Sequence, residues 1–370
     1  MRHSTPFREA WSATAYGQQR LLSSGGGPDG SEPDRTDLKI LRVQPGKATS
    51  HHFHLLRKSW FYILSGSLEV TCRFDDWSVV VTTGDFLELE PGEDHSFFNR
   101  GDSDALVLEV GSPGHMPEDK ISFSAKDRIC SVSAGRYWDE RKDRSLKIKI
   151  GGVESLDAAC LCHELGVDAL GLELDHCHWS RSLARMEWAR RLPRGMSLFL
   201  VTHLTQPTLV TAMLHRLGCD TLQWRGNGEI PSRLPDLYRK VRQHGFRVVH
   251  TLRGTHASVL REVREIGSWV DLFDALVWQP ANRGDMETGA AEQEVILALA
   301  TLAKPWLLAC DHGLDAMSGF VETPCFSGYD ILGSGWRSFC GQSEMLVADR
   351  EKIQRMIPHV HALEKQVRTP

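Results

Sequence analysis

Two rhythms of apolar and polar residues divide this chain of 370 residues. In its first third, short β-branched or alternating apolar runs are separated by Gly, Asp, Pro or Asn, which predicts strands joined by turns. The clearest runs lie at residues 38–43, 61–64, 68–72, 77–82, 86–89 and 105–110. Such a rhythm is typical of a β jelly-roll barrel of about eight strands.

From residue 147 to the end, the pattern alternates between strand and helix. Strands are predicted at residues 147–150, 168–173, 198–201, 221–223, 247–250, 275–277, 306–309 and 329–332. Helices are predicted at residues 155–165, 181–191, 207–217, 234–244, 257–266, 290–302, 314–317 and 350–363. Eight alternating pairs predict a (β/α)8 barrel.

The expected fold class is therefore multidomain, with a β jelly-roll followed by a (β/α)8 TIM barrel. We assign residues 1–36 to a flexible N-terminal segment and residues 37–112 to the jelly-roll domain. Residues 113–146 are a polar linker or strap, and residues 147–370 are the barrel.

Composition and charge limit the partners and the cellular location that we expect for this protein. A formal charge of -5 with well-mixed signs gives no electrostatic basis for binding nucleic acid. No apolar run has the length of a membrane span, and the N-terminus lacks the apolar core of a secretory signal, so we expect a cytoplasmic protein without a membrane partner. The nine cysteines are irregularly spaced, which predicts reduced thiols rather than a disulfide framework.

Three histidines form the first candidate site. His52 and His54 are two residues apart, so their imidazoles share one face of a strand, and His95 follows a Pro-Gly turn at the start of another strand. Imidazoles brought together from two strands can bind a divalent transition metal.

The stretch that contains these histidines resembles the cupins. The residues that carry the resemblance are Gly46, His52, His54, Gly66, Gly84, Pro91, Gly92, His95 and Asn99. Among cupins, the stretch is most similar to the type II phosphomannose isomerases, because it shares Arg57 and an acidic tail that contains Glu118 and Asp119. The resemblance implies an Fe, Mn, Ni or Zn ion held by the three histidines, and no organic cofactor.

One position departs from the cupin pattern. The glutamate ligand of the family falls on Ser59, which is a poor ligand, so a bound metal would have three protein ligands and open coordination sites. The alternative is a degenerate cupin that keeps the barrel and uses His51, His52 and His54 as polar lining.

The second half resembles phosphoribosylanthranilate isomerase, an enzyme of the tryptophan pathway. The matching motifs begin at Lys149, Gly166, Gln223, Asp311 and Asp330. In that family the general base is a Cys, here Gly151, and the general acid is an Asp that closes the sixth strand, here aligned to Trp278. Because the family's rearrangement needs both groups, the resemblance implies a barrel recruited to another reaction.

Titratable residues gather where the barrel strands end, which is where barrel enzymes build their sites. As catalytic candidates we predict Glu173, Asp175, His203, His250 and Asp311. Gln223 and Arg225 are candidates for substrate binding, whereas Asp168 is expected to be a turn or strand-start residue. The alternative is that loops on any protein collect His and Asp.

A phosphate-binding end is predicted after the last two strands. Gly313, Gly333, Ser334 and Gly335 stand where barrel loops offer backbone N–H groups to an anion. By resemblance, Arg181 falls near the arginine that grips the anthranilate carboxylate. We therefore expect a small anionic or phosphorylated substrate, the alternative being an inherited loop that holds nothing.

Three functions remain open from the sequence. The first is an isomerase, epimerase or lyase of specialised metabolism that acts on a phosphorylated sugar or sugar-derived metabolite, without performing the tryptophan-pathway reaction. The second is a metal-dependent cupin oxygenase or lyase with the barrel as a scaffold. The third is a non-catalytic ligand-binding protein. A homodimer formed through the cupin sheets is compatible with each.

Overall fold

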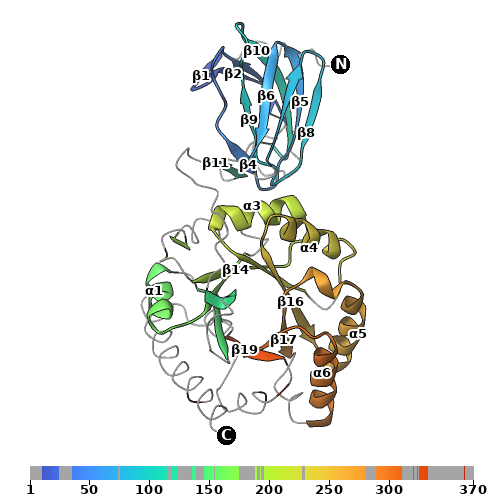
Figure 1. Ribbon diagram of the computed structural model, residues 1–370. Helices are drawn as coiled ribbons and strands as arrows, with labels where there is room; N and C mark the ends of the chain where they lie inside the picture. The colour runs from blue at the N-terminus through green and yellow to red at the C-terminus, as the bar shows by residue number, and fades with distance from the viewer. Residues whose placement is uncertain are drawn as a thin grey trace. The chain divides into compact units, whose positions relative to one another are not determined.

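The computed structural model describes residues 11–24, 36–73, 76–114, 119–122, 136–138, 146–153, 155–174, 188–189, 192, 196–226, 230–280, 289–310, 320, 323, 325–331 and 362. The chain divides into two compact units (Figure 1). The first unit is Met1–Ile129 with Thr208–Ala212, and the second is Cys130–Pro207 with Met213–Pro370.

The first unit is a β-sandwich. Its strands are β1 (Ser12–Thr14), β2 (Gly17–Ser24), β3 (Asp37–Val43), β4 (His52–His54), β5 (Lys58–Ser65), β6 (Ser67–Cys72), β7 (Trp77–Thr82), β8 (Phe86–Leu89), β9 (Ser96–Phe98), β10 (Ala105–Ser112) and β11 (Lys120–Ser122). One sheet has the order β1-β2-β3-β10-β5-β8, a second β7-β6-β9, and a third β11-β4. All six strands predicted from the apolar runs are present, so the jelly-roll prediction is confirmed.

The core of the sandwich consists of side chains that alternate along each strand between the inner and the outer face. Along β10, buried and half-buried positions alternate from Ala105 to Ser112, as expected for a strand with one face on the core. Its inward residue Val107 belongs to a buried cluster with Val43, Phe61 and Phe97. The turn after β5 needs Gly66, which has a φ of +87° and would place a Cβ only 2.9 Å from Ala105 Cα.

Two segments differ from their sequence-based assignment. Residues 12–24, predicted to be flexible, form β1 and β2, and β2 pairs with β3. Residues 120–122 and 136–138, predicted as linker, form β11 and the 3-10 helix η2 (Arg136–Trp138). Few β-branched residues occur in residues 12–24 and 120–122, so their sequence gave no strand signal, and pairing of β2 with β3 and of β11 with β4 supplies the missing preference.

The second unit contains a closed barrel of parallel strands, as predicted. Its strands are β12 (Lys147–Gly151), β13 (Ala169–Glu173), β14 (Ser197–Thr202), β15 (Thr221–Arg225), β16 (Arg247–Gly254), β17 (Ala275–Pro280), β18 (Trp306–Cys310) and β19 (Phe326–Ile331). The described helices are α1 (Leu156–Glu164), α3 (Pro207–Leu217), α4 (Leu234–Gln243), α5 (His256–Ile266), α6 (Gly289–Thr301) and the 3-10 helix η4 (Gly267–Leu272). Figure 1 shows α4, α5 and α6 outside the ring of strands.

Local sequence explains where these helices begin and end. Ser155 caps α1 by accepting a hydrogen bond from Ala158 N, and Thr255 caps α5 through Ser258 N. Pro207 occupies the first turn of α3, which ends at Gly218 in the left-handed conformation. Among the described residues, no helix combines the length and apolar character needed to cross a membrane.

Strand alternation decides which side chains enter the barrel. A buried cluster unites Ala169, Phe199, Val201, Val249, Ala275, Val277, Leu307 and Ala309 with Tyr137 of η2. Because side chains alternate along a strand, the odd-numbered residues of β13 to β18 face the barrel interior and the even-numbered ones face the helices.

Candidate functional site

A cavity of about 740 Å³ lies inside the first unit. It is lined by Ser12, Tyr16, Gln19, Leu21, Asp37, Lys39, Leu41, Thr49, Ser50, His52, His54, Phe61, His95, Phe97, Glu109, Lys120 and Ser122. The structure therefore brings the three sequence-predicted histidines together in a cavity of the size typical of small-molecule sites.

Each of these histidines is held through its Nδ1 atom. His52 Nδ1 donates to Ser50 O at 2.7 Å, and His95 Nδ1 donates to Glu93 O at 3.1 Å. His54 Nδ1 donates to Asp119 Oδ2 at 2.9 Å. Carbonyl and carboxylate oxygens only accept, so the proton of each neutral ring sits on Nδ1 and the lone pair remains on Nε2.

The rings lie close together, and burial favours the neutral form of two of them, His52 and His95. Their centroids are 5.1 Å apart for His52 and His54, 4.5 Å for His52 and His95, and 6.3 Å for His54 and His95. Burial lowers the pKa of His95 to about 4. Burial, followed by the charges of His95 and Lys120, holds the pKa of His52 well below its usual range. Neutral imidazole is the form that binds metals.

These residues fit a transition metal by their donor chemistry. Anchoring Nδ1 to a carboxylate or carbonyl while Nε2 stays open is the usual arrangement of metal-binding histidines. Ser59, on the inward face of β5, is buried and has no partner for its hydroxyl among the described residues, so it adds no anionic ligand. Within the same residues, no group of three or more His, Cys, Asp or Glu side chains already converges on one metal position.

The His51 side chain, unlike that of its neighbour His52, does not line the cavity. Its Nε2 bonds Asp94, a fully buried carboxylate that also accepts from Arg73 N at 2.8 Å. Burial raises the pKa of Asp94, but the hydrogen bonds from His51 and Cys72 outweigh it and lower the pKa. His51 therefore stabilises the loop before His95 instead of facing the cavity.

A buried ion cluster forms another wall of the cavity. Arg57 Nη2 lies 3.0 Å from Glu109 Oε1 and its Nη1 lies 3.5 Å from Asp37 Oδ2, while Lys39 Nζ lies 2.9 Å from Glu109 Oε1. Gly111 makes room for the arginine, because a Cβ there would come within 1.8 Å of Arg57 Cζ. Arg57, which the sequence singled out by resemblance, thus organises the cavity wall.

Sequence reasoning missed most of this cavity. Tyr16, Gln19 and Leu21 come from the segment predicted to be flexible, and Lys120 comes from the predicted linker. Burial raises the pKa of Tyr16 to about 12, and its hydroxyl donates to Gln19 Oε1 at 3.1 Å. The acidic tail quoted for the cupin resemblance was the available signal for β11, since it contains Asp119.

The barrel interior contains a second polar cluster. Lys149 Nζ lies 2.6 Å from Asp330 Oδ1, and neither side chain is exposed. Gln223 Nε2 donates to Asp330 Oδ2 and to Thr251 Oγ1, both at 3.1 Å. The amide nitrogen of Gln223, a predicted substrate-binding residue, is therefore engaged within the barrel, whereas its buried Oε1 has no partner among the described residues, and its role stays a prediction.

Glu173 and Arg225 lie together inside the barrel at the ends of β13 and β15. Arg225 Nη1 is 3.1 Å from Glu173 Oε1, and each side chain is about one-quarter exposed. A Cβ at Gly151 would lie 3.9 Å from the same Glu173 oxygen. His203 follows β14 and is exposed. Two predicted residues, Glu173 and Arg225, are thus brought together, and their roles stay predictions.

His250 does not point into the barrel mouth, contrary to our expectation. It is fully buried on the helix side of β16, where Nδ1 lies 2.7 Å from Tyr238 Oη and Nε2 lies 2.9 Å from Glu262 Oε1. Its even position on the strand sends it outward, toward α4 and α5. The expectation that His250 faces the barrel mouth is therefore wrong, and its contacts do not support a catalytic role there.

The same alternation applies to the end of β17. Trp278 is buried on the outer side, where its ring lies 6.2 Å from the rings of Trp306 and Phe320. Gln279 is the inward neighbour and is buried.

Two further expectations agree with the structure. Asp168 precedes β13 and accepts a hydrogen bond from Ile148 N at 2.9 Å, which confirms it as a strand-start residue. The described cysteines Cys72, Cys160, Cys162, Cys219 and Cys325 are free thiols, as predicted.

The remaining predicted residues lie outside the described residues. They are the catalytic candidates Asp175 and Asp311 and the substrate-binding candidates Arg181, Gly313, Gly333, Ser334 and Gly335.

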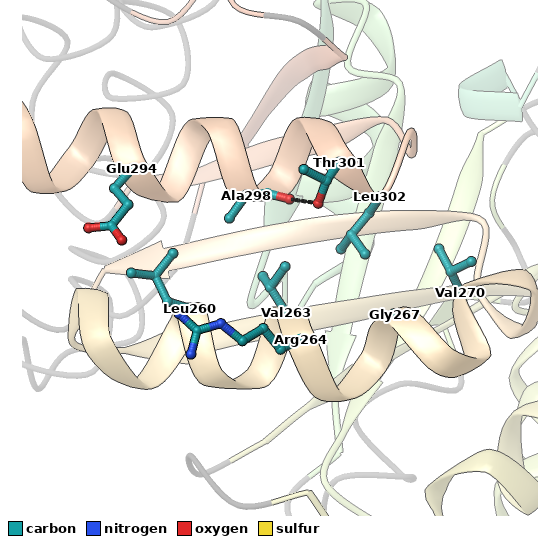
Figure 2. Close-up of a pocket in the computed structure, with 9 residues that line it drawn as sticks. All are labelled: Leu260, Val263, Arg264, Gly267, Val270, Glu294, Ala298, Thr301 and Leu302. Carbon is teal, nitrogen blue, oxygen red and sulfur yellow. Dashed lines mark hydrogen bonds between the residues drawn. The ribbon is translucent and has the colours of Figure 1, made fainter.

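A further hollow of about 430 Å³ lies on the outside of the barrel between α5 and α6 (Figure 2). Leu260, Val263, Val270 and Leu302 form its apolar part, with Arg264 and Glu294 at its charged end in Figure 2. Its polar side chains are those of Arg264, Glu294 and Thr301, and the Thr301 hydroxyl donates to Ala298 O, so no cluster of catalytic groups lines it and we do not treat it as a candidate active site.

Comparison with known proteins supports both halves of this description. Residues 39–111 match the family model described as the cupin domain. The N-terminal region holds a cupin domain. The chain is also 28% identical over 221 residues to N-(5'-phosphoribosyl)anthranilate isomerase of Magnetococcus marinus, a match that covers 58% of this chain and 95% of that protein.

Similar solved structures include two bacterial proteins. One is the polyketide cyclase RemF from Streptomyces resistomycificus, with 22% identity, a TM-score of 0.29 and coverage of 34% of this chain and 88% of that chain. The other is a Cupin 2 conserved barrel domain protein from Salinispora arenicola, with 18% identity, a TM-score of 0.26 and coverage of 31% and 90%. The narrower likeness to type II phosphomannose isomerases stays a prediction.

Proposed function

We propose that this chain is an enzyme that isomerises, epimerises or cleaves a small anionic metabolite in its cupin cavity, with a divalent Fe, Mn, Ni or Zn ion on His52, His54 and His95. The observation that carries the proposal is the shared arrangement of the three rings, in which Nδ1 is anchored and Nε2 is open beside a cavity. When bound, the ion would act as a Lewis acid on a substrate oxygen.

The protein's own groups would orient and shield the substrate. Asp119, Ser50 O and Glu93 O hold the rings in one tautomer. Phe61 and Phe97 contribute apolar wall that limits water. The Tyr16 hydroxyl, whose pKa burial raises to about 12, donates its proton to Gln19 Oε1 and so orients the Gln19 amide at the cavity wall.

The charge of the site favours an anionic substrate. With Ser59 in place of a carboxylate, three neutral imidazoles would leave the charge of a divalent ion uncompensated. An anionic oxygen of the substrate would supply the missing negative charge. We therefore place the chemistry in the cupin cavity and propose that the barrel has another role.

In a second candidate function, the barrel would catalyse the isomerisation or epimerisation of a phosphorylated sugar or sugar-derived metabolite. The observation that favours it is the polar cluster of Lys149, Asp330, Glu173 and Arg225 inside the barrel. The similarity to the anthranilate-pathway isomerase supports a sugar-phosphate ligand. The tryptophan-pathway reaction itself is not proposed, because Gly151 has no side chain and Trp278 faces outward.

Metal analysis and turnover measured on the same variants test the proposal. Full-length protein should bind one metal ion per chain, and His52→Ala or His95→Ala should abolish both metal binding and turnover. His51→Gln is the matched control, because its amide can still donate to Asp94 and support the loop before His95, and it should keep the metal. Turnover that survives the first two changes but is lost in Glu173→Ala would overturn the cupin assignment in favour of the barrel.

A further inference from the structure

The cupin cavity contains one positive charge without a local counter-charge. Lys39 and Arg57 share the carboxylates of Glu109 and Asp37, so these four charges balance. Lys120 also lines the cavity, yet it makes no hydrogen bond or ion pair through its side chain within the described part of the chain. A half-buried ammonium group without a carboxylate is a binding group for an anion.

Strand register directs Lys120 toward the histidines. In the antiparallel pair of β11 and β4, Lys120 is opposite His54 and Ser122 is opposite His52. Side chains directly opposite each other project from the same face, with Cβ atoms about 5 Å apart. All four residues line the cavity, so the ammonium group and the imidazoles face the same space.

Electrostatics agrees with this placement. After burial and the charge of His95, the Lys120 charge is the next cause that lowers the pKa of His52. Burial and the charge of Lys39 lower the pKa of Lys120 itself, although Glu109 opposes them. An incoming negative charge would relieve the repulsion between these lysines.

We infer that Lys120 binds a carboxylate group of the ligand, whose other end lies at His52, His54 and His95. The inference rests on the proposed function for the metal-binding end. It defines the substrate class as a small organic acid with two oxygen-bearing ends. Leu21, Leu41, Phe61 and Phe97 in the cavity wall suit an apolar chain or ring between them.

The donors around Lys120 suit a carboxylate better than a phosphate. Gln19 Oε1 accepts the Tyr16 hydroxyl, which leaves Gln19 Nε2 as a donor, and Ser122 supplies a hydroxyl. Phosphate groups are usually held by a helix N-terminus or by several cations. All described residues that line this cavity come from strands and turns, and Lys120 is the one cation among them without a carboxylate.

Calorimetric titration of the full-length, zinc-loaded protein with glutarate tests the inference. Lys120→Gln keeps the side-chain length but removes the charge, and it should weaken glutarate binding about tenfold or more. Lys120→Arg restores the charge and should retain affinity within about threefold, which separates charge from misfolding. Lys47→Gln removes an exposed lysine of the same domain and should change nothing.

Several results would overturn the inference. They are unchanged glutarate affinity in Lys120→Gln, inorganic phosphate binding more tightly than glutarate, or no glutarate binding at millimolar concentration. The two proposals fail separately. If Lys120→Gln does not change the affinity for glutarate although zinc still binds the histidines, only the carboxylate inference is overturned. Lys120-dependent glutarate binding to a protein that takes up no zinc at the histidines overturns only the proposed function.

Discussion

Lys149 and Asp330 form an ion pair in the interior of the barrel, with Nζ 2.6 Å from Oδ1 and neither side chain exposed to solvent. The residues come from β12 and β19, which are neighbours in the closed sheet although they are far apart in sequence. The pair therefore links the first and last strands of the barrel, in addition to their backbone hydrogen bonds.

Lys149→Met should lower the free energy of unfolding by about 3–5 kcal/mol, because it leaves the buried charge of Asp330 without its partner. Urea unfolding followed by circular dichroism measures this change. Arg239→Ala is the control, since it breaks an exposed pair with Asp236 on α4 and should cost less than about 1 kcal/mol. Equal effects of the two variants would contradict the prediction.

Asp119→Ala should weaken zinc binding about 10- to 100-fold, because His54 loses the carboxylate that fixes its ring and tautomer. Competition with a fluorescent chelator measures the dissociation constant. Asp102→Ala removes the same charge from an exposed turn of the domain and should leave zinc affinity unchanged. An unaltered affinity in Asp119→Ala would show that His54 does not bind the metal through Nε2.

Glu109 should make the cupin domain acid-sensitive. Burial raises its pKa, but the charges of Lys39 and Arg57 outweigh burial and lower the pKa to about 2. Because the folded pKa lies below the ordinary value of 4.5, this stabilisation is complete above pH 4.5 and is lost as the pH falls toward 2. The carboxylate of Asp37 and the ammonium of Lys120 face the same cavity from strands other than Glu109's own.

Thermal unfolding measured from pH 4.5 down toward 2 checks this expectation. The melting temperature of the natural protein should fall steeply over that interval, whereas Glu109→Gln should begin lower and fall less. Parallel curves for the two proteins would show that Glu109 contributes no acid sensitivity.

His250→Leu should destabilise the barrel without affecting the cupin site. The change leaves Tyr238 and Glu262 buried without their shared partner, which predicts a loss of about 2–4 kcal/mol in unfolding free energy. Tyr238→Phe removes one hydrogen bond and should cost about 1 kcal/mol. Zinc and glutarate binding should be unchanged in both variants. Loss of turnover in stable protein would return His250 to the list of catalytic residues.

Much of the fold was predictable because apolar periodicity is strong in both halves. The strands at residues 77–82 and 86–89 and the helix at residues 207–217 have the expected bounds. Strand β2 was missed because its sequence, Gly-Gln-Gln-Arg-Leu-Leu-Ser-Ser, has no alternation and no β-branched residue. Its partner β3 supplies the hydrogen bonds and the register, which no local pattern reveals.

The candidate site was predictable only in part. His52, His54 and His95 follow from local spacing and a turn, and the structure brings them together. Lys120 is separated from His54 by 66 positions, so only the pairing of β11 with β4 makes it a neighbour. The expectation for His250 failed because β16 continues to Gly254, so that His250 lies within the strand instead of at its end, and its position in the alternation directs the side chain toward the helices.

Strand β11 also limits how the protein can be dissected. The residues that match the cupin family stop at 111, whereas the carboxylate behind His54 and the cavity's unpaired ammonium group lie at 119 and 120. A fragment trimmed to the family boundary would retain all three imidazoles and still lack the groups that hold one of them and attract the substrate. Such a fragment would be expected to fold as a cupin but to bind metal and ligand weakly, and that weakness would say nothing about the full-length chain.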